Sequence, residues 1–259
     1  MNKLHESGLV PLAAAKKKLE RIEKVVLIGS GKGGVGKSTI ASGLALSLSQ
    51  EGQKTALFDI DIHGSSVPEY VDVTPPLSSN KDGLEPKMKG GLKVMSLGLF
   101  TGSVPLPIRG NSKQELITQL FALTDWGDLD CLIVDLPPSM GDELLSAFRI
   151  FSGKATLALV TTPSPVSVSV VLRLRRLAEI EKVPVDGVIV NMAYLLAGNR
   201  KSFPFGRPDR KLLESDFASI IIGEVPLEPL VSIRGLSTAL RDSNEFSRAF
   251  RKLAHCIVS

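Results

Sequence analysis

Apolar runs rich in β-branched residues recur along the chain, and stretches of helical periodicity separate most of them. The apolar runs occupy residues 24–30, 54–59, 92–98, 131–136, 155–162, 186–192 and 219–226. The amphipathic stretches occupy residues 37–51, 112–124, 141–151, 165–182, 208–217 and 244–256. Continuous apolar strands that alternate with helices indicate a parallel sheet covered on both faces. The pattern therefore predicts an α/β fold with a doubly wound, mainly parallel sheet of about seven to eight strands flanked by helices.

The same pattern divides the chain into a short extension and one domain. Residues 1–23 are polar and basic and are interpreted as an N-terminal extension, which leaves residues 24–259 as a single domain. Residues 62–91 and 195–209 are interrupted by Gly, Pro and Ser, so we expect functional loops or local disorder there. The last amphipathic stretch has apolar residues on one face, a pattern that favours docking on its own domain over binding to a membrane surface.

Composition and charge exclude several classes of protein. Of the 259 residues, 43% are hydrophobic and 22% are charged, which is ordinary globular composition. A net charge of +4 favours anionic ligands, but the chain has no basic stripe of the kind that nucleic-acid binding needs. No apolar run reaches the ~18–20 residues of a membrane span, and the N-terminal residues do not resemble a signal peptide. With two cysteines, Cys131 in an apolar run and Cys256, we expect a cytoplasmic protein in a reducing compartment.

A glycine-rich segment follows the first apolar run and opens the first amphipathic stretch. Residues 31–38 fit the pattern G-x-x-x-x-G-K-[ST] of a phosphate-binding loop. Glycines allow backbone N–H groups to approach phosphate oxygens, and the following helix adds partial positive charge. Lys37 is expected to reach the β- and γ-phosphates, Ser38 to offer its hydroxyl to Mg²⁺, and Thr39 to bind the α-phosphate. The predicted ATP-binding residues here are Gly31, Lys32, Gly33, Gly34, Val35, Gly36, Lys37, Ser38 and Thr39.

Three aspartates follow predicted strands. Asp135 closes the run "CLIVD", and ligands of parallel sheets collect at the carboxyl ends of strands, so this carboxylate is placed to serve Mg²⁺. Asp59 and Asp61 lie in "DIDIHG" just past another strand, and their carboxylates are expected to point to opposite sides. One of the two can face Mg²⁺, and we assign Asp59 to the metal with Ser38 and Asp135. Asp61 is assigned to the γ-phosphate side, where it could orient the attacking water.

Beyond these single motifs, the chain resembles a known family. "KGGVGKST" is similar to the deviant Walker A motif of the MinD/Mrp class of P-loop ATPases. The segments "DIDIHGSSVPE", "PIRGN", "DWGDLDCLIVDLPPSMGDE" and "VIVNM" followed by "GEVPLEP" resemble the Mrp-type iron–sulfur carriers within that class. The resemblance covers residues 24–240, or most of the chain.

The resemblance implies a homodimer that encloses two ATP molecules. In that family the extra lysine, here Lys32, crosses the interface to the nucleotide of the second copy, which would make hydrolysis depend on dimerisation. By the same resemblance Asp61 would position the water, Asp135 would serve Mg²⁺ and Asn191 would contact the adenine. Lys32, Lys37 and Asp61 are thus the expected catalytic residues.

One departure from the family bears on the cargo. Mrp-type carriers hold a bridging cluster on a C-x-x-C pair after the "NM" segment, and this chain has no cysteine there. An iron–sulfur cluster on the usual thiolate ligands is therefore not expected. The ATPase-type maturation proteins of nickel–iron hydrogenases also lack the pair and share "DIHGSS", "PIRG", "PPSMGDELL" and "TPSPVSVSVV" with this chain. The missing pair favours this branch, because a partner carries the nickel there and the ATPase needs no cysteine ligands. The chain's own histidines, His5, His63 and His255, are scattered along the sequence and suggest no nickel site.

The resulting expectation is a dimeric Mg-ATP-dependent ATPase of metallocofactor assembly, with a metallochaperone or an apo-metalloprotein as its client. The alternative is a MinD- or ParA-like positioning protein whose ATP-bound dimer binds a membrane or DNA. The sequence makes this alternative weaker, since neither a dense basic face nor a strongly suited membrane helix is present. Residues 195–209 replace the cluster-binding region of the family and are predicted to dock a partner.

Overall fold

The computed structural model describes residues 3–61, 64–81, 83–100, 113–198, 200–207 and 221–258. Several sequence features lie outside these ranges: His63, the "PIRGN" segment, and the amphipathic stretch 208–217. The side chains of residues 3–11, which include His5, and of residue 221 are likewise not described.

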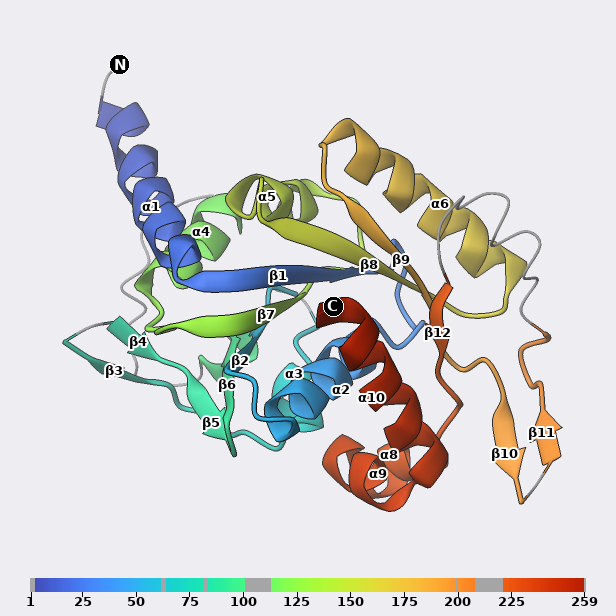
Figure 1. Ribbon diagram of the computed structural model, residues 1–259. Coiled ribbons are helices and arrows are strands. Elements are labelled where there is room, and N and C mark those ends of the chain that lie inside the picture. Colours follow the sequence, from blue (N-terminus) through green and yellow to red (C-terminus); the bar gives the residue numbers. More distant parts are fainter. Residues whose placement is uncertain are drawn as a thin grey trace.

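An eight-stranded sheet forms the centre of the described structure, in the order β12-β9-β8-β1-β7-β2-β6-β5. Its strands are β1 (Ile22–Gly29), β2 (Thr55–Asp59), β5 (Lys87–Lys89), β6 (Leu92–Ser96), β7 (Leu129–Asp135), β8 (Ala155–Thr161), β9 (Val185–Val190) and β12 (Ile221–Glu224). All neighbouring strands pair in parallel except β5, which is antiparallel to β6 at one edge. The predicted fold class is confirmed, and the carboxyl ends of the parallel strands share one edge of the sheet (Figure 1).

Helices cover both faces of the sheet. The helices are α1 (Lys3–Glu20), α2 (Lys37–Gln50), α3 (Val67–Tyr70), α4 (Lys113–Leu123), α5 (Asp142–Ile150), α6 (Pro165–Ile180), α8 (Pro229–Arg234), α9 (Leu236–Asp242) and α10 (Asn244–Val258). In Figure 1, α1, α4, α5 and α6 lie on one side of the sheet, and α2 lies on the other with α3, α8, α9 and α10. This two-sided covering explains why the strands read as continuous apolar runs.

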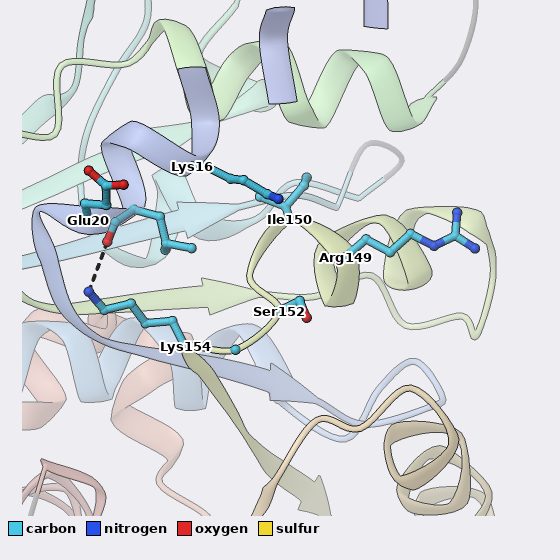
Figure 2. A pocket seen from close by; sticks show the side chains of 8 residues that line it. Lys16, Glu20, Arg149, Ile150, Ser152 and Lys154 are labelled. Carbon is cyan, nitrogen blue, oxygen red and sulfur yellow. Dashed lines mark hydrogen bonds between the residues drawn. The ribbon is translucent and has the colours of Figure 1, made fainter. Parts of the chain in front are cut away.

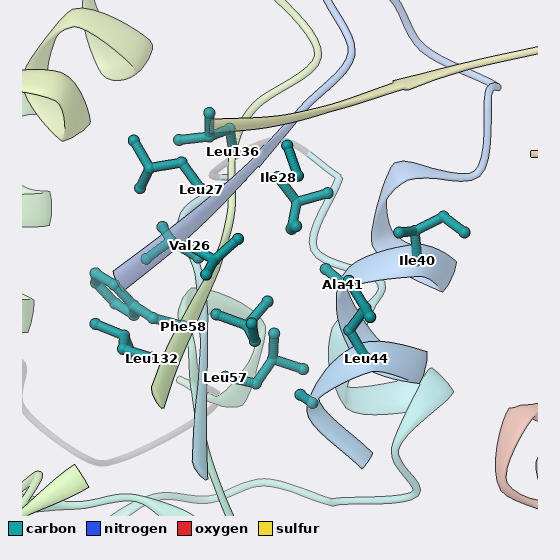
Figure 3. Close-up of a cluster of buried hydrophobic side chains, with 14 of the residues drawn as sticks. Val26, Leu27, Ile28, Ile40, Ala41, Leu44, Leu57, Phe58, Leu132 and Leu136 are labelled. Atoms are coloured by element: carbon teal, nitrogen blue, oxygen red, sulfur yellow. The ribbon is translucent and has the colours of Figure 1, made fainter. Parts of the chain in front are cut away.

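The packing of α2 on the sheet shows how the core is built. In Figure 3, Ile28 and Leu57 face the helix, where Ile40 and Leu44 meet them, and all four side chains are buried. The neighbouring positions of both strands point to the opposite face. There Phe58 packs in an aromatic cluster, with its ring centroid 5.4 Å from that of Trp126. The core therefore anchors β1 and α2, the two elements between which the glycine-rich segment runs.

The last helix, α10, docks on its own domain, as its pattern predicts. Phe246, Phe250, Leu253 and Ile257 are all buried. The Phe250 ring lies so close to Gly43 of α2 that a Cβ at this glycine would collide with it. The apolar face of α10 is thus covered within the chain. Among the described residues, none of the helices combines the length and apolar character required to cross a bilayer.

The N-terminal helix α1 packs on α4 and α5, and β1 starts at Ile22, two residues before the predicted strand. Ala15 and Leu19 bury their side chains there, and Lys154 donates a hydrogen bond to the Leu19 carbonyl at 3.2 Å (Figure 2). A cavity of about 540 Å³ lies beside this contact, lined by residues that include Lys16 and Arg149. The division of the chain at residue 23 stays a prediction.

The two segments expected to be loops contain short regular elements. Residues 62–91 include α3, the hairpin of β3 (Ser78–Asn80) and β4 (Gly83–Glu85), and the edge strand β5. Residues 195–207 include the hairpin of β10 (Leu195–Ala197) and β11 (Arg200–Ser202). These strands are three residues long and mostly exposed, so they lack the apolar pattern that reveals a strand in a sequence.

Candidate functional site

The glycine-rich segment connects the end of β1 to the first turn of α2. Gly34 and Gly36 have φ values of +80° and +81°, which side chains other than glycine rarely tolerate. A Cβ at Gly33 or Gly34 would meet no other atom, so open space lies beside this part of the loop. The segment borders a cavity of about 220 Å³ lined by Lys32, Gly33, Gly34, Gly36, Lys37, Ser38, Asp61, Gly64, Ser66, Tyr70 and Pro138. Backbone N–H groups at the start of a 14-residue helix make such a cradle suitable for phosphates.

A buried ion pair lies under this cradle. The Lys37 ammonium is 2.6 Å from Oδ1 of Asp135, and the two side chains are 6% and 1% exposed. Lys37 begins α2 and Asp135 ends β7, so the parallel sheet brings together residues 98 positions apart. Burial raises the pKa of Asp135, and the charge of Lys37 opposes this rise. The sequence predicted both residues for the site but not their direct contact.

The second oxygen of Asp135 has a different environment. Its Oδ2 is buried and accepts no hydrogen bond from any described residue. The hydroxyl of Ser38 interacts with the same carboxyl group. A carboxylate oxygen without a donor, next to a serine hydroxyl, fits Mg²⁺, which needs few protein ligands because it keeps waters and binds phosphate oxygens. Within the described ranges, no three His, Cys, Asp or Glu side chains gather to hold a metal by themselves.

Asp59 lies on the next strand, opposite Asp135 in the β2–β7 register, and is fully buried. Its Oδ1 accepts a hydrogen bond from the backbone N–H of Asp61 at 3.0 Å. Its Oδ2 accepts hydrogen bonds from the hydroxyls of Ser65 at 2.6 Å and Ser96 at 2.9 Å. Burial and the neighbouring charge of Asp135 raise the pKa of Asp59 to about 7. Protein donors therefore occupy both oxygens, and the assignment of Asp59 to Mg²⁺ stays a prediction.

Asp61 and Lys32 both line the cavity. The half-buried Asp61 accepts a hydrogen bond from the Gly64 N–H at 3.1 Å, which shapes the turn after β2. The backbone carbonyl of Lys32 accepts a hydrogen bond from the Ser30 hydroxyl at 2.9 Å, whereas its ammonium forms no ion pair with any described residue. The catalytic roles of both residues stay predictions.

Asn191 lies behind the phosphate loop. Its Nδ2 donates a hydrogen bond to the Val35 carbonyl at 2.8 Å, and the side chain is 4% exposed. A Cβ at Gly36 would collide with this amide, so the loop needs glycine there for both space and φ. Asn191 thus supports the loop from the end of β9, a contact that the sequence did not reveal. Its predicted role in contacting adenine remains a prediction.

Sequence reasoning missed the two serines that bind Asp59. Ser96 is fully buried at the end of β6, and its hydroxyl also accepts a hydrogen bond from the Gly98 N–H at 3.1 Å. A serine that ends an apolar run is the one signal that could have indicated it, because buried hydroxyls need partners. Ser65 carried no such signal, since it lies in a segment that is rich in small polar residues.

Neither cysteine belongs to a group of metal-ligating side chains within the described residues. Cys131 is fully buried on β7, and burial raises the pKa of its thiol to about 12. Cys256 is exposed on α10. A protonated core thiol is a poor metal ligand, so Cys131 does not contribute to a metal site.

The fold and the site together define a P-loop NTPase. The first strand of the parallel sheet leads through a glycine loop into a helix, and Lys37 and Asp135 form an ion pair beneath the loop. Residues 21–258 match the ParA family model that is described as "NUBPL iron-transfer P-loop NTPase", and the chain belongs to this family. The match confirms the resemblance inferred from the motifs.

Relatives in this family carry names from iron–sulfur assembly. The chain is 33% identical over 221 residues to the iron–sulfur cluster carrier protein of Saccharolobus solfataricus, covering 83% of this chain and 75% of the relative. It is 31% identical over 255 residues to the carrier protein of Methanocaldococcus jannaschii, covering 95% and 88%. It spans 46% of the chloroplastic Fe-S cluster assembly factor HCF101 of Arabidopsis thaliana, at 32% identity over 93% of this chain.

Solved structures agree on the architecture. The nucleotide-binding protein of Archaeoglobus fulgidus, determined with ADP and with cobalt detected, superposes with a TM-score of 0.77 at 28% identity. The match covers 92% of this chain and 96% of that protein. The septum site-determining protein MinD of Pyrococcus horikoshii has a TM-score of 0.65 at 16% identity, covering 89% and 94%, a likeness in fold alone.

Proposed function

We propose that this chain is a Mg-ATP-dependent ATPase that works as a homodimer in metallocofactor assembly. The observation that carries the proposal is the Lys37–Asp135 pair at 2.6 Å, whose second carboxylate oxygen lacks a donor among the described residues. Lys37 of this pair and the neighbouring Ser38 line the same cavity as Gly33 and Gly34. The NUBPL iron-transfer match, over residues 21–258, and the ADP of the Archaeoglobus relative support a nucleotide as the ligand.

Each residue at the cradle has a task in this proposal. The loop N–H groups and Lys37 bind and orient the phosphates, and the dipole of α2 favours their charge. Ser38 and Asp135 would hold Mg²⁺, which supplies charge neutralisation at the phosphates. Asp61 orients the attacking water, and Lys32 stabilises the transition-state charge on the nucleotide of a second copy.

The cargo follows from the cysteines and the relatives together. The names of the relatives support the assembly or transfer of a metal centre as the purpose of the ATPase. The segment after Asn191 has no cysteine pair and forms the β10–β11 hairpin instead. We therefore infer a metal that stays bound to a partner, such as a metallochaperone or an apo-metalloprotein. The missing pair favours nickel–iron hydrogenase maturation, and iron–sulfur transfer is the competing branch.

A positioning ATPase is the second candidate, because MinD proteins share the fold. Such a protein needs a surface for a membrane or DNA. The apolar face of α10 is buried in the domain, which weakens the membrane version of this candidate. A pI of about 9.0 gives little support to DNA by itself, because the sequence has no dense basic stripe. A cytoplasmic location is part of the proposal.

The test combines turnover, assembly state and metal content. The purified chain should hydrolyse ATP with Mg²⁺ and form a dimer in light scattering when ATP is present. Lys32→Ala should still bind ATP but lose dimerisation or turnover. A monomer that hydrolyses ATP as fast as the wild type would contradict the proposed role of Lys32.

Isolation from the natural host separates the two branches. Stoichiometric nickel in a co-purifying partner would support hydrogenase maturation, whereas an iron–sulfur chromophore on the chain itself would overturn it. ATP-dependent sedimentation with liposomes or DNA would favour the positioning candidate instead.

A further inference from the structure

We infer that the β10–β11 hairpin is the docking surface for a protein partner with an acidic, apolar-lined recess. The inference rests on the proposed function, because it describes the chemistry of the client that the ATPase serves. The hairpin surface is defined as residues 195–198 and 200–207. β10 and β11 pair with each other and stand apart from the eight-stranded sheet (Figure 1).

The hairpin is anchored firmly at its base. The Leu227 N–H donates a hydrogen bond to the Tyr194 carbonyl at 2.7 Å, which ties the start of the hairpin to the segment after β12. The Tyr194 hydroxyl donates to Oε1 of Glu245 on α10 at 2.9 Å. Burial, with this neighbouring carboxylate, raises the pKa of Tyr194 to about 12, so the donor keeps its proton. A short hairpin held at its base presents its outer residues in a defined geometry, and this lowers the entropic cost of binding.

The exposed side chains of the hairpin carry one sign of charge. Residues 195–207 include Arg200, Lys201 and Arg207 and no acidic residue. All three residues of β11 are exposed. Such a concentration of positive charge favours a partner with negative potential, since complementary fields raise the rate and specificity of association. It disfavours a second copy of the same hairpin, because two cationic surfaces would repel each other.

Apolar side chains lie among these cations. Phe205 is 48% exposed and Leu196 is 36% exposed. A large apolar residue surrounded by charge is the usual composition of the centre of a protein interface, where an aromatic anchor fills a pocket and charged residues surround it. Phe205 is the expected anchor.

The aromatic rings favour a protein over a nucleic acid. The Lys201 ammonium lies 3.7 Å from the centroid of the Tyr194 ring, and the Arg207 guanidinium lies 4.5 Å from that of Phe203. Both rings therefore already have a cation on one face, and both lie partly or fully in the core. Binding of single-stranded nucleic acid relies on several open aromatic faces on which successive bases stack, and among the described hairpin residues Phe205 alone offers an exposed ring.

The hairpin also has a direct connection to the phosphate loop. It follows Asn191, whose amide binds the Val35 carbonyl, after only a short connection through Met192. A partner on the hairpin would therefore bind a segment that is joined to the cradle through Asn191 and the residues between Asn191 and β10.

Photocross-linking in the natural host provides the first arm of the test. The cross-linking residue p-benzoylphenylalanine replaces Phe205 in the full chain, and a control chain carries it at Met88, 54% exposed on the opposite edge strand. A protein adduct at position 205 that is absent at position 88 is expected. The adducted protein is then purified, and its dissociation constant is measured with the unmodified chain over a range of salt concentrations.

Charge reversal provides the deciding arm. Arg200→Glu and Lys201→Glu together should weaken binding of that protein by about tenfold or more and reduce the salt dependence. Lys17→Glu on α1 changes charge at an exposed site away from the hairpin and should leave the affinity within about twofold. ATP hydrolysis by the hairpin variant should equal that of the wild type, so a failure of the proposed ATPase function would appear separately.

Four outcomes overturn the inference. They are an adduct with a second copy alone, an adduct with nucleic acid or lipid, no adduct specific to position 205, and an affinity that the double charge reversal leaves unchanged or lowers no more than Lys17→Glu does.

Discussion

The ends of β2 and β7 lie side by side in the sheet, and each ends in a buried aspartate. Asp135 of β7 faces the Lys37 ammonium and has one oxygen without a donor among the described residues. Asp59 of β2, its register partner, accepts three hydrogen bonds from a backbone N–H and two serine hydroxyls. Two chemically identical side chains on neighbouring strands thus have different partners. The end of β7 can accept a new cation, whereas the end of β2 holds the turn that carries Asp61.

The largest effect is expected at the end of β7. Lys37→Ala should abolish ATP binding and lower the free energy of unfolding by about 3–5 kcal/mol, because the mutation leaves the Asp135 carboxylate buried without its cation. Urea denaturation and calorimetric titration with ATP measure both quantities. Lys32→Ala is the matched control, since the Lys32 ammonium forms no ion pair with a described residue. Its free energy of unfolding should differ from that of the wild type by less than about 0.5 kcal/mol. Equal destabilisation by the two variants would contradict the importance of the buried pair.

The second effect concerns the turn that Asp59 holds. Asp61→Ala should keep ATP binding but lower turnover by about a hundredfold and accumulate the ATP-bound dimer, because the water loses its orienting carboxylate. Single-turnover kinetics and light scattering provide the measurements. Normal hydrolysis by this variant would show that the end of β2 has no catalytic task.

A smaller effect is expected from Ser96→Ala. This substitution removes one donor to the Asp59 carboxylate and should lower the free energy of unfolding by about 1–3 kcal/mol. Ser42→Ala is the matched control, because the Ser42 hydroxyl is buried and has no partner among the described residues. Its removal should be neutral or slightly stabilising, and urea denaturation compares the two. If both variants behave alike, the Asp59 network contributes nothing to stability.

A further effect is a dependence of stability on pH. The pKa of Asp59 is raised from 3.8 to about 7, so the folded chain keeps a proton that the unfolded chain has already lost. The free energy of unfolding should therefore fall as pH rises between these values, and the raised pKa of Asp135 acts in the same direction. Thermal unfolding across this range should show the decline, and Asp59→Asn should reduce its slope. A stability that rises with pH in this window would contradict the assignment.

Much of this site could be predicted from the residue order. The glycine pattern, Lys37, Ser38 and Asp135 follow from a local motif and from the rule that strand ends meet at one edge of the sheet. Asn191 was predicted to contact adenine. Its hydrogen bond to the Val35 carbonyl joins residues 156 positions apart, and no local pattern in the sequence reveals such a contact. Ser96 was missed for the same reason, and Ser65 was missed because it lies among other small polar residues.

The order of apolar and polar residues was enough to predict the parallel sheet and several of its covering helices, but not α8 and α9. A glycine motif predicted the phosphate loop. These features depend on periodicity and on short motifs, which are local properties of the chain. The partners of Asp59 and Asp135, the anchoring of the β10–β11 hairpin and the close contact of Phe250 with Gly43 became visible only in the folded structure. They depend on burial and on contacts between distant residues, because a side chain's charge state and donors are set by the neighbours that folding brings to it.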